Sequence, residues 1–187
     1  MGLKLYGGAR SRASIVQWYL EELGQPYEFV LLDMQVGEHR QPDFLAINPM
    51  GKVPALVDGD FTLWESGAIL LYLAEKYSQD ASTLEQRSHL AQWVLFANAT
   101  LGPGLFTEST REKERATLFP ALNQILDQHP FLMGDTFTVA DVAVGAYLSY
   151  MTLMLGITYE EYPALNTYVN QLTDRPAYQN TIGARRA

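Results

Sequence analysis

The pattern of apolar residues changes character near residue 77, and this change constrains the possible folds more than any other feature of the sequence. Before it, short strand-like runs alternate with helical stretches, whereas after it the apolar residues recur almost only at helical spacing. Alternating strands and helices are typical of an α/β sheet, and a run of helices alone is typical of a bundle. We therefore expect an α/β domain over residues 1–77, a polar linker over 78–86 and an all-helical domain over 87–187.

The first domain is expected to contain a mixed sheet of four strands. A strand, a helix and a second strand in succession predict a parallel pair with the helix packed against it. Two later runs flank Asp58-Gly59-Asp60, which is typical of a hairpin turn and adds an antiparallel pair. The predicted strands cover residues 3–6, 27–32, 53–57 and 61–63, and the predicted helices cover residues 14–23 and 66–77.

The second domain is expected to contain only helices. The first carries an apolar stripe that ends at Gly102-Pro103-Gly104, and Pro120 should kink the second helix or reset its start. A third helix should begin at Thr138, because Thr138 and Asp141 have the spacing of a capping box. This makes Asp141 a helix-start residue rather than a catalytic acid. The second helix and the last two helices are expected over residues 111–128, 162–173 and 176–183.

Charge and composition argue against several classes of function. The net charge of −8 opposes binding to phosphate backbones and anionic lipid heads, so we expect neither a nucleic-acid nor a membrane partner. The chain has no cysteine, which excludes disulfides, thiolate metal sites and a cysteine nucleophile. Its three histidines are scattered, so no metal site is expected. The first residues lack the features of a signal peptide, and we expect a cytoplasmic protein.

Two dipeptides, Val53-Pro54 and Glu65-Ser66, carry most of the chemical information. Pro54 cannot donate to a ladder, and a cis bond before it would let the Val53 backbone face a peptide-like ligand. Ser66 begins a helix, whose first amides bind carboxylates, and Glu65 can bind an ammonium group. Those two groups form the α-amino-acid end of a γ-glutamyl peptide. Either dipeptide alone would be a strand end or a helix cap, but the two together favour a peptide-binding site.

These residues resemble the glutathione-site signature of the cytosolic glutathione transferase family, from Asn48-Pro49 through Val53-Pro54 to Glu65-Ser66. The stretch from Phe131 to Asp141 is similar to the family's capping motif in the second domain. The resemblance covers nearly the whole chain. It implies a thioredoxin-like domain followed by an all-helical domain, a homodimer, and glutathione as a co-substrate with no other cofactor.

The resemblance also implies roles for individual residues. The Val53 backbone should pair with the cysteinyl unit of glutathione, and Glu65 and Ser66 should bind the γ-glutamyl end. Lys52 and His39 should face the glycine carboxylate, which a local group of basic residues in an acidic chain favours independently. The binding residues that we predict are Arg12, His39, Lys52, Val53, Pro54, Glu65 and Ser66, and Arg40 could join Lys52 and His39 at the carboxylate.

In this family the residue that activates the thiol follows the first strand. Counting from Leu3 places Ser11 at the serine position of theta-like and plant-type members, with Ser14 as the next candidate. Arg10 or Arg12 could assist the thiolate directly. Ser11 could instead only cap the following helix. The length of the chain and the absent consensus activator are similar to the chi class of cyanobacteria.

The predicted function is conjugation of the glutathione thiolate to small hydrophobic electrophiles, as in detoxification. The alternative enzymes are a glutathione-dependent isomerase of the maleylacetoacetate type and a peroxidase. Outside catalysis, the alternative is an interaction module that shares the fold. A wall for the electrophile could come from Tyr147, Tyr150, Met151 and Met154, although core packing is the better explanation for them.

Overall fold

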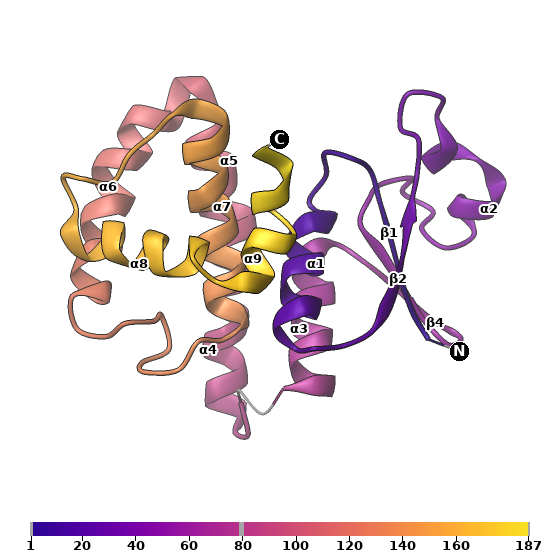
Figure 1. Ribbon diagram of the computed structural model, residues 1–187, viewed down its shortest axis with the longest axis horizontal. Coiled ribbons are helices and arrows are strands. Elements are labelled where there is room, and N and C mark those ends of the chain that lie inside the picture. The colour runs from indigo at the N-terminus through magenta and orange to yellow at the C-terminus, as the bar shows by residue number, and fades with distance from the viewer. Residues whose placement is uncertain (1, 79–80, 187) are drawn as a thin grey trace. The chain divides into compact units, whose positions relative to one another are not determined.

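The computed structural model of the protein describes residues 2–78 and 81–186 (Figure 1). The chain forms two compact units, unit 1 over residues 1–78 and unit 2 over residues 79–187. Residues 79–80 of the expected linker lie outside the described residues. Helix α4 already begins at Leu84, within the expected linker, because Thr83 and Gln86 form a capping box there.

Unit 1 contains a four-stranded mixed sheet in the order β2-β1-β3-β4, as the sequence predicts. β1 pairs in parallel with β2, and the pairs β1–β3 and β3–β4 are antiparallel. β3 begins one residue after Pro54, because proline has no N–H to donate to a ladder. The strands are β1 (Leu3–Gly7), β2 (Tyr27–Leu31), β3 (Ala55–Asp58) and β4 (Phe61–Trp64).

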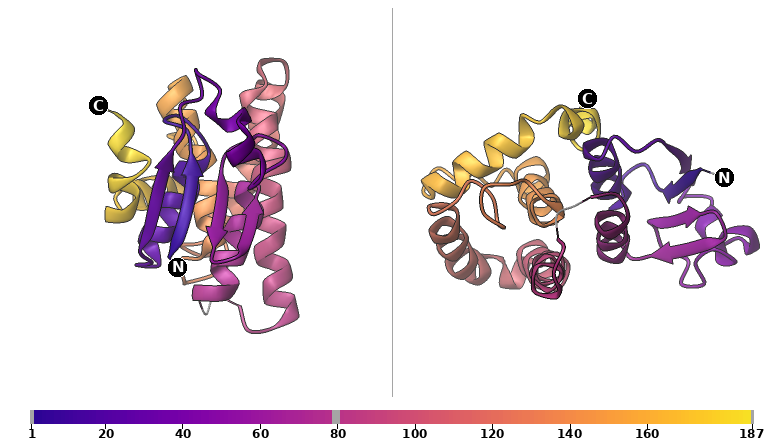
Figure 2. Two further views of the ribbon diagram at one scale, coloured as in Figure 1. Left: turned by 90° about the vertical axis from the view of Figure 1, so that its right-hand side faces the viewer. Right: turned by 90° about the horizontal axis from the view of Figure 1, so that it is seen from below.

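Helices α1 (Ala13–Glu22) and α3 (Ser66–Tyr77) lie side by side on one face of this sheet (Figure 2). Leu5 of β1, Trp18 of α1 and Leu73 of α3 are almost completely buried, so the sheet and both helices contribute apolar side chains to the core. The short helices η1 (Glu38–Arg40) and α2 (Pro42–Leu45) connect β2 to β3.

Unit 2 is helical in its described part. Helix α7 is buried along most of its length and packs against α4, α5 and α8, so it forms the centre of the unit. The helices are α4 (Leu84–Leu95), η2 (Phe96–Leu101), α5 (Gly102–Phe106), α6 (Glu108–Leu126), α7 (Val139–Leu155), α8 (Pro163–Thr173), α9 (Pro176–Asn180) and η3 (Gly183–Arg186). None of the helices in the described ranges combines the length and apolar character that crossing a membrane requires.

One expectation for unit 2 is wrong, and another is wrong in one of its two alternatives. The chain does not leave the helical path at Gly102-Pro103-Gly104, because η2 is a π-helix that leads directly into α5, where Pro103 occupies the first turn and needs no N–H. Gly102 has a packing role there, since a Cβ on it would lie 2.7 Å from the ring of Tyr147. Pro120 does not reset the start of α6, which runs from Glu108 through it to Leu126.

The capping box at the start of α7 is confirmed. The Thr138 side chain accepts a hydrogen bond from the Ala140 amide, and Asp141 accepts one from the Thr138 amide at 2.8 Å. Asp141 is therefore a helix-start residue, as the sequence predicts.

Candidate functional site

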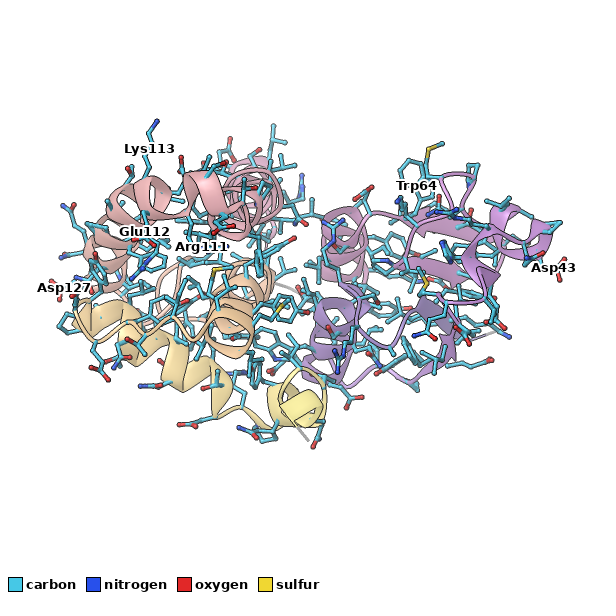
Figure 3. All side chains as sticks on the ribbon, turned by 90° about the horizontal axis from the view of Figure 1, so that it is seen from above. Asp43, Trp64, Arg111, Glu112, Lys113 and Asp127 are labelled. Atoms are coloured by element: carbon cyan, nitrogen blue, oxygen red, sulfur yellow. The ribbon has the colours of Figure 1, made fainter. Side chains whose placement is uncertain are left out.

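The strand register brings the predicted site segments to one end of the sheet in unit 1. Tyr6 of β1 pairs with Ala55 of β3, and Ala55 pairs with Trp64 of β4, which Figure 3 labels. The chain after Tyr6, before Ala55 and after Trp64 therefore leaves the sheet at the same end. The segments that meet there contain Ser11, Val53-Pro54 and Glu65-Ser66.

Asn48 organises the turn that leads to Val53. It is 1% exposed, and its Nδ2 donates to the Lys52 carbonyl oxygen at 2.7 Å while its Oδ1 accepts from the Met50 amide at 3.0 Å. Gly51 completes the turn with φ 59°, a conformation that suits glycine. The sequence motif contains Asn48, but its role as the internal brace of the turn is a finding of the structure.

Val53 and Pro54 follow this turn. The bond between them is cis. Pro54 is buried and Val53 is half-buried. The β1–β3 and β3–β4 registers begin at Ala55, so the Val53 backbone lies outside both ladders.

Glu65 and Ser66 join β4 to α3 with an unusual backbone. Glu65 has φ 72° and ψ 120°, and no other non-glycine residue in the described ranges has a positive φ. Such a conformation costs about 1–3 kcal/mol and persists where its surroundings impose it, commonly at functional sites. Ser66 is the first residue of α3 and is 1% exposed, whereas Glu65 is exposed. The pair places a carboxylate beside the positive end of a 12-residue helix.

The Ser11 hydroxyl is bonded to the backbone of its own loop. Its oxygen accepts hydrogen bonds from the Gly8 amide at 3.1 Å and the Ala13 amide at 3.3 Å, and it donates to the Gly8 carbonyl oxygen at 3.0 Å. A hydroxyl has one proton to donate. Ser11 can therefore donate to a thiolate only after its O–H rotates away from the Gly8 carbonyl.

The other candidates for thiol activation differ in exposure. Ser14 is fully buried and its hydroxyl donates to the Ser11 carbonyl oxygen at 3.0 Å, so it supports the loop from within. Arg10 and Arg12 are both exposed, and Arg12 is the residue before α1. Two exposed guanidinium groups therefore flank Ser11 in the chain.

The residues predicted to face the glycine carboxylate lie on η1 and on the Asn48 turn. His39 is half-buried, and its Nδ1 is buried without a hydrogen-bond partner among the described residues. Such an unmet nitrogen costs about 1–3 kcal/mol. Lys52 and Arg40 are exposed. No group of three or more histidine or acidic side chains in the described ranges is placed to hold a metal.

Unit 2 has an aromatic cluster next to its π-helix. The Tyr147 hydroxyl donates to Asn98 Oδ1 at 3.1 Å, and Asn98 Nδ2 donates to the Val94 carbonyl oxygen at 2.9 Å. The rings of Phe106 and Tyr150 contact the Tyr147 ring edge to face, with centroids 6.4 and 6.3 Å away. The half-buried rings of Phe106 and Tyr150 are the part of this cluster that unit 2 could offer to an apolar compound.

Of the four residues that could form a wall for the electrophile or pack in the core, two are buried and two reach the surface. Tyr147 and Met151 are 6% and 0% exposed and belong to the core, whereas Tyr150 is half-buried and Met154 is 67% exposed. Arg111, on α6 (Figure 3), donates to the carbonyl oxygens of Leu105 and Phe106 and so fixes the end of α5.

A thioredoxin-like sheet with these site segments at one end, followed by a helical unit, defines a two-domain protein of the cytosolic glutathione transferase type. The sequence matches the glutathione S-transferase N-terminal domain over residues 1–75 and the glutathione S-transferase C-terminal domain over residues 110–171. It is 34% identical to the glutathione S-transferase GstB of Escherichia coli, over 87% of this chain and 88% of that protein.

Solved structures of glutathione transferases have the same fold as this chain. The glutathione transferase URE2P5 of Phanerochaete chrysosporium has a TM-score of 0.86 and 28% identity, over 98% of this chain and 94% of that one. URE2P6 of the same organism, in complex with oxidised glutathione, has a TM-score of 0.83 and 31% identity, over 99% and 96% of the two chains. This chain therefore belongs to the glutathione S-transferase family, and it is a transferase.

Proposed function

We propose that this chain binds glutathione at the sheet end of unit 1 and transfers the thiolate to small hydrophobic electrophiles. The observation that carries the proposal is the backbone of Glu65, which is held at φ 72° directly before the buried Ser66. The helix N-terminus suits the α-carboxylate of the γ-glutamyl unit, and the Glu65 carboxylate suits its ammonium group. A structural turn would not need this strained conformation at an acidic residue.

The other contacts follow from the chemistry of the tripeptide. The Val53 backbone, outside the ladders, is proposed to pair with the cysteinyl unit. Lys52 and His39, with Arg40, are proposed to bind the glycine carboxylate. Glutathione is the co-substrate, and the proposal needs no metal or other cofactor.

Ser11 is proposed as the main activator of the thiol, with Arg10 or Arg12 adding to it. A free thiol with a pKa of about 8.5 is only about 3% thiolate at pH 7. When the Ser11 hydroxyl leaves the Gly8 carbonyl and donates to sulfur, it stabilises the anion that is the nucleophile. The sulfur then forms a bond to the electrophilic carbon. The leaving group departs with its electron pair or, in an addition, the product takes a proton from water.

The proposal also covers the class of electrophile, the assembly and the location of the protein. The half-buried rings of Phe106 and Tyr150, which pack on the buried Tyr147, support hydrophobic, often aromatic, electrophiles, and such conjugation serves detoxification. We propose a cytoplasmic homodimer, and the chi class remains a prediction of the sequence. The alternatives are a glutathione-dependent isomerase or peroxidase and a non-catalytic interaction module.

Two measurements test the proposal in sequence. Retention on immobilised glutathione is expected, and its absence would refute the binding site. Turnover is then measured with an aryl halide, an isothiocyanate and an organic hydroperoxide. Conjugation of the first two supports the transferase, turnover of the hydroperoxide alone would favour the peroxidase, and retention without any turnover would favour the interaction module.

A further inference from the structure

The connection from β2 to α2, residues 32–41, contacts both loops of the proposed glutathione site. β2 is parallel to β1, so this connection leaves the sheet at the same end as the Ser11 loop. The Leu32 amide donates to the Gly7 carbonyl oxygen at 2.8 Å, which extends the pairing one residue beyond β2. The chain then turns through Gly37, with φ 79°, into η1 and α2.

The first contact is between Met34 and Gly8. A Cβ added to Gly8 would lie 2.8 Å from Met34 Cγ and 3.3 Å from its Sδ, so the Met34 side chain lies directly against Gly8 and would have to shift to admit a Cβ. Gly8 is also the residue whose amide and carbonyl both bond to the Ser11 hydroxyl. Met34 therefore packs against the backbone that orients the Ser11 O–H.

The second contact is between His39 and Gly51. A Cβ added to Gly51 would lie 3.1 Å from the His39 carbonyl oxygen. The Gly51 amide donates to the Asn48 carbonyl oxygen at 2.9 Å, within the turn that leads to Lys52 and Val53. The connection therefore touches the Ser11 loop with one end and the Asn48 turn with the other.

Two acidic side chains, Asp33 and Glu38, hold the connection in this path. Asp33 Oδ1 accepts from the amides of Gln35 at 2.8 Å and Val36 at 3.3 Å. Glu38 Oε2 accepts from the Asp33 amide at 2.7 Å, and the Glu38 amide donates to the Asp33 carbonyl oxygen at 3.1 Å. These four bonds close the turn that separates the two contacts.

The charge of these two side chains does not favour the ligand. Both Asp33 and Glu38 are exposed, and they lie in the segment that carries His39, which is proposed to bind a carboxylate. Negative charge near that position repels an anionic tripeptide. The hydrogen bonds to the backbone are therefore the physical reason for acceptors at these two positions.

We propose that Asp33 and Glu38 are positioning residues for glutathione. They hold residues 32–41 against Gly8 and Gly51, and so fix the Ser11 loop relative to the turn that carries Lys52 and Val53. This inference rests on the proposed function. It adds two residues that act through the backbone of the site rather than through attraction to the ligand.

The variants Asp33→Ala and Asp33→Asn separate geometry from charge. Both remove the negative charge, but asparagine keeps a carbonyl oxygen that can accept from the Gln35 and Val36 amides. By isothermal titration with reduced glutathione, Asp33→Ala should raise the Kd about tenfold, because two hydrogen bonds that order the turn are lost. Asp33→Asn should keep the wild-type Kd or lower it. Charge alone predicts tighter binding in both variants.

Matched controls make the outcome decisive. Asp60→Ala removes an exposed carboxylate from the β3–β4 turn and should change the Kd by less than about twofold. Glu38→Ala and Glu38→Gln repeat the comparison at the other acceptor, and they decide the matter if thermal unfolding shows that Asp33→Ala does not fold. Equal Kd values within both the Asp33 and the Glu38 pairs would overturn the inference. A wild-type protein that binds no glutathione would instead overturn the proposed function.

Discussion

Replacing Asp141 by alanine tests what holds the start of α7. Asp141 is 0% exposed, and its carboxylate accepts from the Leu132 amide at 2.9 Å, the Thr138 amide at 2.8 Å, the Thr138 hydroxyl at 3.2 Å and the Tyr168 hydroxyl at 3.0 Å. Alanine leaves two backbone N–H groups buried without an acceptor, at about 1–3 kcal/mol each. Removing a desolvated carboxylate returns part of this loss. We expect a net destabilisation of about 3 kcal/mol.

Thermal unfolding followed by circular dichroism measures this effect. For a chain of this size about 1 kcal/mol shifts Tm by about 2–4 °C, so Asp141→Ala should lower Tm by roughly 6–12 °C. Asp135→Ala is the matched control, because that side chain is 89% exposed, and it should leave Tm nearly unchanged. Glutathione retention by the folded variant should persist, since the proposed site lies in unit 1. A Tm of Asp141→Ala equal to that of Asp135→Ala would refute the reasoning.

The stability difference between wild type and Asp141→Ala should also depend on pH, in a direction set by the pKa of Asp141. Burial raises the pKa of Asp141 above its ordinary value of 3.8, and the hydrogen bonds from Leu132, Thr138 and Tyr168 oppose the rise. A carboxyl with a raised pKa binds more protons in the folded state, so its contribution to stability falls as pH increases from the unfolded to the folded pKa. In urea titrations, the advantage of wild type over Asp141→Ala should be largest near pH 4 and decline above it. An advantage that grows with pH would show that the hydrogen bonds outweigh burial.

Three further predictions concern the proposed site and assembly. The double variant Glu65→Ala/Ser66→Ala should stay folded and bind glutathione two to four powers of ten more weakly, because two hydrogen bonds to charged groups contribute about 1.5–3 kcal/mol each. An unchanged Kd by isothermal titration would refute the proposed binding site. Ser11→Ala should raise the pKa of bound glutathione, followed as thiolate absorbance, by roughly one to two units. If only Arg10→Ala or Arg12→Ala raises it, an arginine is the activator. Light scattering at micromolar concentration should give a mass near twice the 21.0 kDa of one chain, and a mass of one chain would exclude the homodimer.

Much of the fold could be predicted from the sequence because many helix and strand ends are determined by residues next to them in the chain. The spacing of Ile69, Leu70, Leu73 and Tyr77 predicts a helix over residues 66–77, and α3 has those bounds. Gly24, with φ 61°, ends α1 with the Gln25 amide bonded to the Leu20 carbonyl, as a glycine after a helix suggests. Failures arose where a distant residue decides. Gly102 and Pro103 predict the end of a helix. The chain stays helical there because Gly102 packs against Tyr147 and because a π-helix precedes it, which no local sequence pattern predicts.

The same difference between local and distant causes separates the predictable from the unpredictable parts of the proposed site. The dipeptides at Val53 and Glu65 are visible in the sequence because their backbone chemistry is local. The bonds of Asn48 to Lys52 and of Glu38 to Asp33 depend on the path of a loop, which residue types alone do not specify. The one available signal was Asp33 itself, since an aspartate often bonds to amides two and three residues onward.

The π-helix also affects how the protein should be handled in a secretory host. Asn98-Ala99-Thr100 is an acceptor sequence for N-linked glycans. In the folded chain the half-buried Asn98 amide donates to the Val94 carbonyl oxygen and its oxygen accepts from Tyr147, so a sugar on Nδ2 would replace one of its two N–H groups at a hydrogen-bonded position. We expect a glycan at this position to oppose the native packing of η2. The sequence is best removed at Thr100, which is exposed, because Asn98→Gln would remove an asparagine that bridges η2, α4 and α7.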